Sequence, residues 1–259
     1  MALLFSTVGG RWAAGRRPFL ADGSVLVITA TLLLGAFLLR VYQIDKQELW
    51  LDEASSFYTT TGTMDLGRLL RTEYTPPLYE LLLRWWVWCA GTSEASLRML
   101  SAIFGTLFVP AAIWSGYVLF SRRVGLWAGA FATIAPIHIY YSQEARAYAL
   151  LVLLLMLASV LLWRALLLQI RAAWVLVTTL GILALYTHYF AILAILPTTF
   201  MVFLPQHRQQ AKQNWHRLGA AAVVCGVVYV PLLYRHLVLT NHPRGELNWL
   251  QLFWEQTPP

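Results

Sequence analysis

The sequence predicts an all-α protein that crosses a membrane several times. Of its 259 residues, 59% are hydrophobic and only 12% are charged, whereas soluble domains carry about 25% charged residues. A bilayer core requires about 20 apolar residues in a helix. Four stretches of roughly this length contain almost no charge, namely Val25–Leu39, Leu100–Phe120, Ala147–Leu168 and Leu218–Leu233. A water-soluble fold could not cover so many apolar faces.

Hydrophobic runs separated by polar loops predict about seven transmembrane helices. Their expected bounds are Ser24–Val41, Arg98–Phe120, Val124–Tyr140, Ala147–Leu168, Ala173–Thr187, Tyr189–Leu204 and Leu218–Arg235. The stretch Ala173–Leu204 is too long for one span and tight for two. We expect two, because two spans keep Arg171 and the basic loop Pro205–Arg217 on the same side.

The segment Pro76–Gly91 could be mistaken for a further span. Its length corresponds to about 24 Å of helix, which is short of the ~30 Å hydrocarbon core. Glu80 and Arg84 are four residues apart within it, a spacing that suits an ion pair on an interfacial helix. We therefore expect this helix to lie flat on the membrane, inside a long first outer loop at about residues 42–97.

The distribution of charge predicts the orientation of the helices. If the N-terminus is cytoplasmic, ten basic residues lie inside, and eleven of the twelve acids lie outside. We therefore expect a multi-pass protein of the inner cell membrane, in contact with its lipids and anchored by an uncleaved N-terminal signal. The net charge of +7 is then a consequence of topology and does not indicate nucleic-acid binding. Cys89 at the outer surface and Cys225 within a span are not expected to form a disulfide.

Two adjacent carboxylates, Asp52 and Glu53, follow the first predicted span by about ten residues. On a short helix their side chains point about 100° apart, so one can face a cavity while the other binds a metal, an arginine or a helix end. Acids in the first turn of a helix are also common for purely structural reasons. The pair alone therefore leaves both interpretations open.

Three further polar groups are expected on the same side of the membrane and at a similar depth. Glu73 precedes the helix-starting Pro76–Pro77 pair, and His188 lies at a boundary between two spans. The loop between them contains Gln143, Glu144, Arg146 and Tyr148, in which Arg146 could bind a phosphate. Each group has an ordinary alternative: a loop–helix junction, an interfacial histidine or a surface ion pair. Together they indicate a functional site at the membrane boundary.

Four segments resemble, in order, motifs of the glycosyltransferase 39-like group. This group includes protein O-mannosyltransferases, lipid A aminoarabinose transferases and RgtA/B/C/D-like proteins. The segments are Leu49-Trp50-Leu51-Asp52-Glu53-Ala54, Thr75-Pro76-Pro77-Leu78-Tyr79, Leu97-Arg98-Met99-Leu100-Ser101 and Tyr141-Ser142-Gln143-Glu144-Ala145-Arg146-Ala147-Tyr148. The resemblance covers about residues 41–189.

The resemblance implies a GT-C fold, with residues 1–259 forming a single transmembrane module. It implies that Asp52, beside Glu53, is the catalytic base of the first outer loop. It also implies that Glu144 and Arg146, with Gln143 and Tyr148, form the polar cluster of the second loop. Glu73 and His188 match less securely. Some members bind a divalent cation near such acids, which here would be Asp52, Glu73 and Glu144, and others require no cofactor.

We therefore expect an inverting transfer of a sugar from a polyprenyl-phosphate carrier to a hydroxyl of a glycan, lipid or protein at the outer face. Family members usually continue with more spans and a C-terminal outer domain, which this sequence is expected to lack. One alternative is a catalytically silent fragment or partner subunit that binds a lipid carrier. Another is a transporter or flippase component, which would place ionisable groups near the bilayer midplane in paired broken helices.

Overall fold

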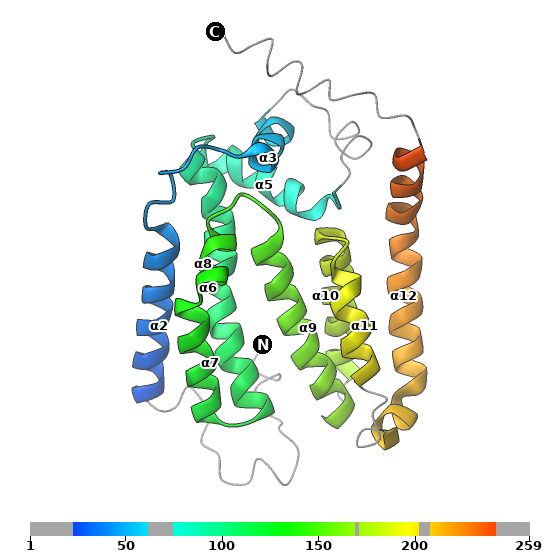
Figure 1. Ribbon diagram of the computed structural model, residues 1–259. Helices are drawn as coiled ribbons and strands as arrows, with labels where there is room; N and C mark the ends of the chain where they lie inside the picture. Colours follow the sequence, from blue (N-terminus) through cyan, green and yellow to red (C-terminus); the bar gives the residue numbers. More distant parts are fainter. Residues whose placement is uncertain (1–22, 62–74, 169–170, 202–207, 242–259) are drawn as a thin grey trace.

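The computed structural model describes residues 23–61, 75–168, 171–201 and 208–241, and all regular structure in these ranges is helical (Figure 1). The helices are α2 (Gly23–Val41), α3 (Leu51–Thr61), α5 (Leu78–Ala90), α6 (Glu94–Leu119), α7 (Arg122–Ile134), α8 (Pro136–Ser142), α9 (Tyr148–Leu168), α10 (Arg171–Thr187), α11 (Ala191–Met201) and α12 (Arg208–Asn241). The prediction of an all-α polytopic membrane protein is confirmed. The apolar run of the predicted signal anchor forms α2, whereas residues 1–22 before it and residues 242–259 of the predicted C-terminal tail lie outside the described residues.

The number of spans differs from the prediction. Among the described residues, α2, α6, α9 and α12 are long and apolar enough to cross a membrane, and the bent pair α7–α8 makes a fifth candidate. Helices do occur at all seven predicted positions. However, α10 has 17 residues and α11 has 11, which correspond to about 25 Å and 17 Å of helix. Seven full spans are therefore not confirmed.

The third predicted span is broken into α7 and α8, which meet at an angle of 58°. Pro136 begins α8 and has no N–H, so the carbonyl of Ala132 loses its helical hydrogen bond. The buried guanidinium of Arg40, from α2, donates to the carbonyls of Ala132 at 3.0 Å and Thr133 at 3.4 Å. The sequence prediction of a continuous helix missed this break although Pro136 is a local signal for it, and it could not show the partner Arg40, which is far away in the sequence.

The helices α3 and α5 lie together across one end of the bundle (Figure 1). With 13 residues, α5 is too short to span a bilayer, in agreement with the prediction for Pro76–Gly91. Its buried face, including Tyr79 and Leu83, packs in one apolar cluster with residues of α6, α9 and α10 such as Leu97, Leu150 and Leu185. This cluster fixes α5 against the ends of the long helices.

Close helix packing also joins α6 to α7 at the opposite end of the bundle, where α6 ends and α7 begins. A Cβ added at Gly116 of α6 would lie 2.7 Å from Cα of Gly125 in α7, so only glycine permits this approach. The helix α6 also packs against α2 and α9. It therefore contacts α2, which precedes the segment before α3, and α9, which follows the loop that contains Glu144.

Candidate active site

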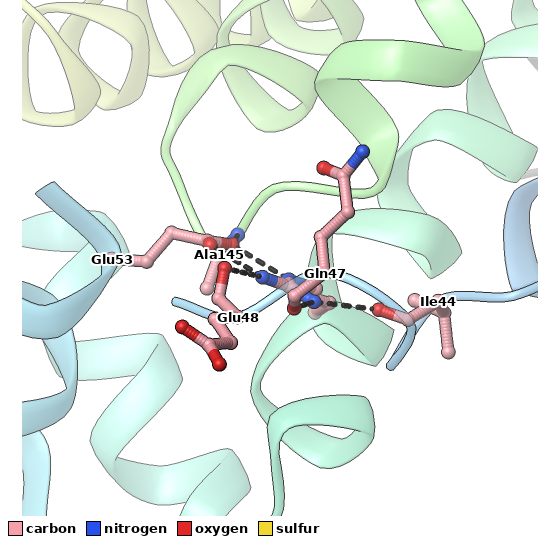
Figure 2. Close-up of polar contacts among 6 residues, drawn as sticks. Ile44, Gln47, Glu48, Glu53 and Ala145 are labelled. Atoms are coloured by element: carbon pink, nitrogen blue, oxygen red, sulfur yellow. Dashed lines mark hydrogen bonds and ion pairs between the residues drawn. The ribbon is translucent and has the colours of Figure 1, made fainter. Parts of the chain in front are cut away.

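Glu53 joins the start of α3 to α6 through a buried ion pair and to the loop before α9 through a hydrogen bond. Its side chain is only 1% exposed, and it lies in the first turn of α3. Nε of Arg98 donates to Oε1 at 2.9 Å and Nη2 donates to Oε2 at 2.7 Å. The backbone N–H of Ala145 donates to the same Oε1 at 2.8 Å. Both oxygens of Glu53 are therefore occupied by partners from α6 and from the loop before α9 (Figure 2).

Arg98 also organises the segment between α2 and α3. Its guanidinium donates to the backbone carbonyls of Ile44, Gln47 and Glu48 at 2.8, 2.7 and 3.2 Å, as Figure 2 shows. Sequence reasoning did not select Arg98 as a site residue. A signal was present, because Arg98 is a single charged residue at the start of an apolar span and lies within one of the recognised motifs.

Asp52 meets Arg146 at the boundary of the two loops. Nη1 of Arg146 donates to the carbonyl oxygen of Asp52 at 3.2 Å. Nη2 lies 3.8 Å from Oδ2 of the Asp52 carboxylate. The side chain of Asp52 is 43% exposed, whereas that of Arg146 is 14% exposed. The acid of the first loop and the cation of the second loop are thus adjacent, and the carboxylate stays accessible.

Arg146 is held in place by polar side chains from three elements. Nη1 also donates to Oγ of Ser56 in α3 at 3.2 Å, and Ser56 in turn donates to Oε1 of Glu80 at 2.9 Å. Ser101 of α6 donates to the carbonyl of Arg146 at 3.0 Å. Because Ser101 has only one hydroxyl hydrogen, the Tyr79 hydroxyl, 2.7 Å away, is the donor to Ser101.

Glu80 differs from its expected place on the surface of an interfacial helix. Its carboxylate is buried beneath α3 and accepts hydrogen bonds from Ser56 and Thr59 at 2.9 and 3.3 Å. Burial raises the pKa of Glu80 above its ordinary value, and these hydrogen bonds and the charge of Arg146 oppose the rise. The i,i+4 spacing to Arg84 missed these partners because they come from another helix.

A small cavity of about 10 Å³, the size of one water molecule, brings Arg146, Tyr148 and His188 together. The rings of Tyr148 and His188 are 5.6 Å apart between centroids. Nδ1 of His188 accepts from the N–H of Phe190 at 3.1 Å, so the proton of the neutral ring is on Nε2. Burial and the charge of Arg146 lower the pKa of His188, which favours the neutral ring.

Glu144 and Gln143 line a different and larger cavity of about 550 Å³. The side chain of Glu144 is 7% exposed, and its Oε2 has no hydrogen-bond partner among the described residues. Burial raises the pKa of Glu144, and the negative charge of Glu53 adds to the rise, while a hydrogen bond with Tyr140 opposes it. The amide of Gln143 donates to the carbonyl of Tyr42 at 2.9 Å. Glu144 and Arg146, although two residues apart, therefore line separate cavities.

A third cavity, of about 400 Å³, is apolar and lies among α9, α10, α11 and α12. Its walls include Leu155, Leu185, Ile195 and Tyr229. The helix α10 lines this cavity and then ends at Thr187, which lines the small cavity with Arg146. The same helix thus connects an apolar cavity to a cationic one.

Cation binding at Asp52, Glu73 and Glu144 stays a prediction. Glu73 lies outside the described residues. Within the described part of the chain, no group of three or more His, Cys, Asp or Glu side chains is arranged to hold a metal ion. Asp52 contacts Arg146, whereas Glu144 lines the larger cavity. These two acids therefore have different surroundings.

The fold and this site define a polytopic helical membrane protein in which two loops at one end of the bundle place an acid beside an arginine. Residues 74–234 match the model of the family described as dolichyl-phosphate-mannose-protein mannosyltransferase. The chain belongs to this family and is a membrane glycosyltransferase of the GT-C type. The matched segment contains Arg98, the Gln143–Tyr148 loop and His188, and it begins after Asp52 and Glu53. No curated protein and no solved structure matches the chain.

Proposed function

We propose that this protein transfers a sugar from a polyprenyl-phosphate carrier to an acceptor hydroxyl at the outer face of the membrane, with inversion at the anomeric carbon. The observation that supports this most directly is the 3.8 Å approach of Nη2 of Arg146 to Oδ2 of Asp52. A general base and a cation for a departing phosphate are the two groups that such a reaction needs.

Asp52 acts as the general base in this mechanism. Its exposed carboxylate takes the proton of the acceptor hydroxyl as that oxygen attacks the anomeric carbon. A new bond forms between the acceptor oxygen and the sugar, and the bond from the sugar to the phosphate oxygen breaks. The electron pair of the broken bond stays on the polyprenyl phosphate. One displacement inverts the anomeric centre without a covalent intermediate.

Glu53 has a positioning role in this proposal, although it belongs to the same acidic pair. Both of its oxygens accept short hydrogen bonds from Arg98 or Ala145. Neither oxygen is therefore free to meet the hydroxyl group of an acceptor. Glu53 instead keeps α3 and the second loop together, so that Asp52 and Arg146 meet.

Arg146 and His188 bind the phosphate of the donor. Arg146 supplies a positive charge and paired N–H donors that fit phosphate oxygens. The neutral His188 ring carries its proton on Nε2 and lines the same small cavity. The proposal requires this cavity to widen on binding, because its volume of about 10 Å³ holds no more than one water molecule. Charge that develops on the leaving oxygen is stabilised there.

The polyprenyl tail lies in the apolar cavity among α9, α10, α11 and α12. Its volume of about 400 Å³ is suited to the first isoprene units, and its walls are apolar. Thr187 and Leu185, two residues apart on α10, line the cationic and the apolar cavity respectively. The proposal places the tail in the apolar cavity and requires the phosphate to pass the end of α10 to reach the small cavity.

The proposed orientation places this end of the bundle outside the inner membrane and the N-terminus in the cytoplasm. Arg122 and Arg123 begin α7 at the opposite end of the bundle from α3 and α5 (Figure 1). Basic residues favour the cytoplasmic side. Tyr140, Tyr141 and Tyr148 form a chain of ring contacts beside the site, as is typical of aromatic side chains at the headgroup level.

A transfer assay with the purified protein and labelled polyprenyl-phosphate sugars tests the proposal. The substitution Asp52→Asn removes the base and should lower the rate of sugar transfer by about 100-fold or more. Asp45→Asn is the matched control, because Asp45 is an exposed acid of the same loop and lines neither polar cavity. Equal rates for Asp52→Asn and the wild type would refute the role of Asp52.

A further inference from the structure

The 550 Å³ cavity beside Glu144 has no role in the mechanism above. Its walls come from the segment between α2 and α3 and from the end of α8, and they include Tyr42, Lys46, Trp50, Tyr140, Gln143 and Glu144. This volume is in the range of pockets that bind small organic ligands, about 300–1,000 Å³. None of the residues of α9 to α12 lines it, so it is separate from the proposed path of the donor lipid.

The chemistry of the cavity combines aromatic rings with hydrogen-bonding groups. Tyr42 and Trp50 are exposed aromatic residues in its wall. Glu144 is more than nine-tenths buried, and its Oε2 accepts no hydrogen bond from the described residues. A buried carboxylate oxygen without a donor is costly, so a ligand that donates a hydroxyl hydrogen would be stabilised there.

We propose that this cavity binds the acceptor of the transfer reaction and that the acceptor is a saccharide. A sugar has hydroxyl groups that donate to Glu144 and also accept from the ammonium group of Lys46, which lines the same cavity. It also has C–H faces, which pack against the negative faces of aromatic rings such as Trp50. This inference rests on the proposed function, because it names the acceptor class of the same reaction.

The position of the cavity agrees with this assignment. Glu53 and Trp50 line the cavity and flank Asp52 on the chain. Arg146 lines the donor-side cavity, yet it contacts Asp52. Asp52 thus lies where an acceptor hydroxyl from one cavity can reach a sugar whose phosphate is held in the other. An in-line displacement requires such an arrangement of acceptor and leaving group.

The charge of the cavity disfavours an anionic acceptor. Arg98 and Glu53 neutralise each other through their ion pair. The remaining charged groups in the wall are two carboxylates, Glu48 and Glu144, and one ammonium, Lys46. A neutral polyhydroxylated ligand or a cationic sugar fits this balance better than a phosphorylated one. A polypeptide acceptor is the principal competing class and is included in the test.

Saturation-transfer NMR with the purified protein in nanodiscs, without any donor, measures saccharide binding directly. The probes are a panel of neutral and amino-group-bearing di- and trisaccharides and a serine- and threonine-rich peptide. We expect at least one saccharide to bind, and Trp50→Ala to weaken that binding by about tenfold, the loss of roughly one good contact. Trp88→Ala is the matched control, because Trp88 is an exposed tryptophan of α5 outside the cavity. The variant Glu144→Gln should also weaken saccharide binding. If this variant does not fold, the comparison of Trp50→Ala with Trp88→Ala decides the test.

The outcomes separate this inference from the proposed function. The inference is overturned if no saccharide binds, if Trp50→Ala binds saccharides as tightly as the wild type does, or if only the peptide binds at this cavity. Each of these results stands whatever the outcome of the Asp52→Asn assay. Conversely, saccharide binding that depends on Trp50, together with transfer that does not depend on Asp52, would leave a saccharide site and remove the proposed base.

Discussion

At the scale of single residues, two adjacent acids have different surroundings. Asp52 is 43% exposed beside Arg146, whereas Glu53 is 1% exposed and fully hydrogen-bonded. The sequence predicts that one member of such a pair can face a cavity while the other binds an arginine. It does not reveal which arginine, because Arg98 is 45 residues away and reaches Glu53 only after α6 has packed against α3.

The pair provides a prediction about stability. Glu53→Gln leaves the buried guanidinium of Arg98 without its counter-charge, which should lower the free energy of unfolding by about 3–5 kcal/mol. Asp52→Asn, at an accessible side chain, should change it by less than about 1 kcal/mol. Thermal unfolding in detergent compares the two variants. Similar melting temperatures for both would contradict the assigned difference between the two acids.

The buried carboxyl group of Glu80 should make the stability of the folded protein depend on pH. Burial raises the pKa of its carboxyl group in the folded protein, so between the unfolded and the folded pKa the folded state binds more protons. Its contribution to stability is therefore complete below the unfolded pKa and is lost as pH rises through the folded pKa. Glu80→Gln should remove this slope. Melting temperatures of the wild type and the variant, measured from about pH 4 to about pH 8, should converge at low pH. The prediction would be contradicted if the melting temperature of the wild type, compared with that of Glu80→Gln, decreased as the pH is lowered.

At the scale of elements, the sequence predicts the places of the helices better than their shapes. Apolar runs predict a helix at each of the seven positions, and the short length of Pro76–Gly91 predicts a helix that does not span. Those features depend on local composition. The break between α7 and α8 begins at Pro136, but the carbonyls beside it are satisfied by Arg40, almost a hundred residues earlier, and the burial of Glu80 depends on hydroxyl groups from α3. Such features require tertiary contacts that no single segment contains.

Arg40 predicts the stability of the broken span. Arg40→Ala removes the donor to the carbonyls of Ala132 and Thr133 and to the hydroxyl of Ser142. Each buried group that loses its partner should cost about 1–3 kcal/mol, so the melting temperature should fall clearly. Arg123→Ala, at an exposed arginine that begins the same broken span, is the control and should have little effect. An unchanged melting temperature for Arg40→Ala would show that other groups satisfy these carbonyls.

At the scale of the whole molecule, the three cavities differ in polarity according to their place in the bundle. The polar cavities lie at the end that α3 and α5 cover, and the apolar cavity lies deeper among α9 to α12. The sequence predicts that the acidic loops share one side of the membrane. It does not predict that Glu144 and Arg146 line different cavities, because this depends on the backbone between Ser142 and Tyr148, where the Glu53 carboxylate binds the N–H of Ala145.

The two native cysteines allow a direct test of the orientation. Cys89 is exposed near the end of α5, and Cys225 is half-buried within α12. If the polar cavities face outward, a membrane-impermeant maleimide should label Cys89 in intact spheroplasts, whereas Cys225 should stay unlabelled because apolar helices and lipid surround it. In a Cys89→Ala background, Gln209→Cys near the start of α12 should react only after the membrane is made permeable. Labelling of Gln209→Cys in intact spheroplasts, with protection of Cys89, would place the acid–arginine site in the cytoplasm and would require a donor on that side.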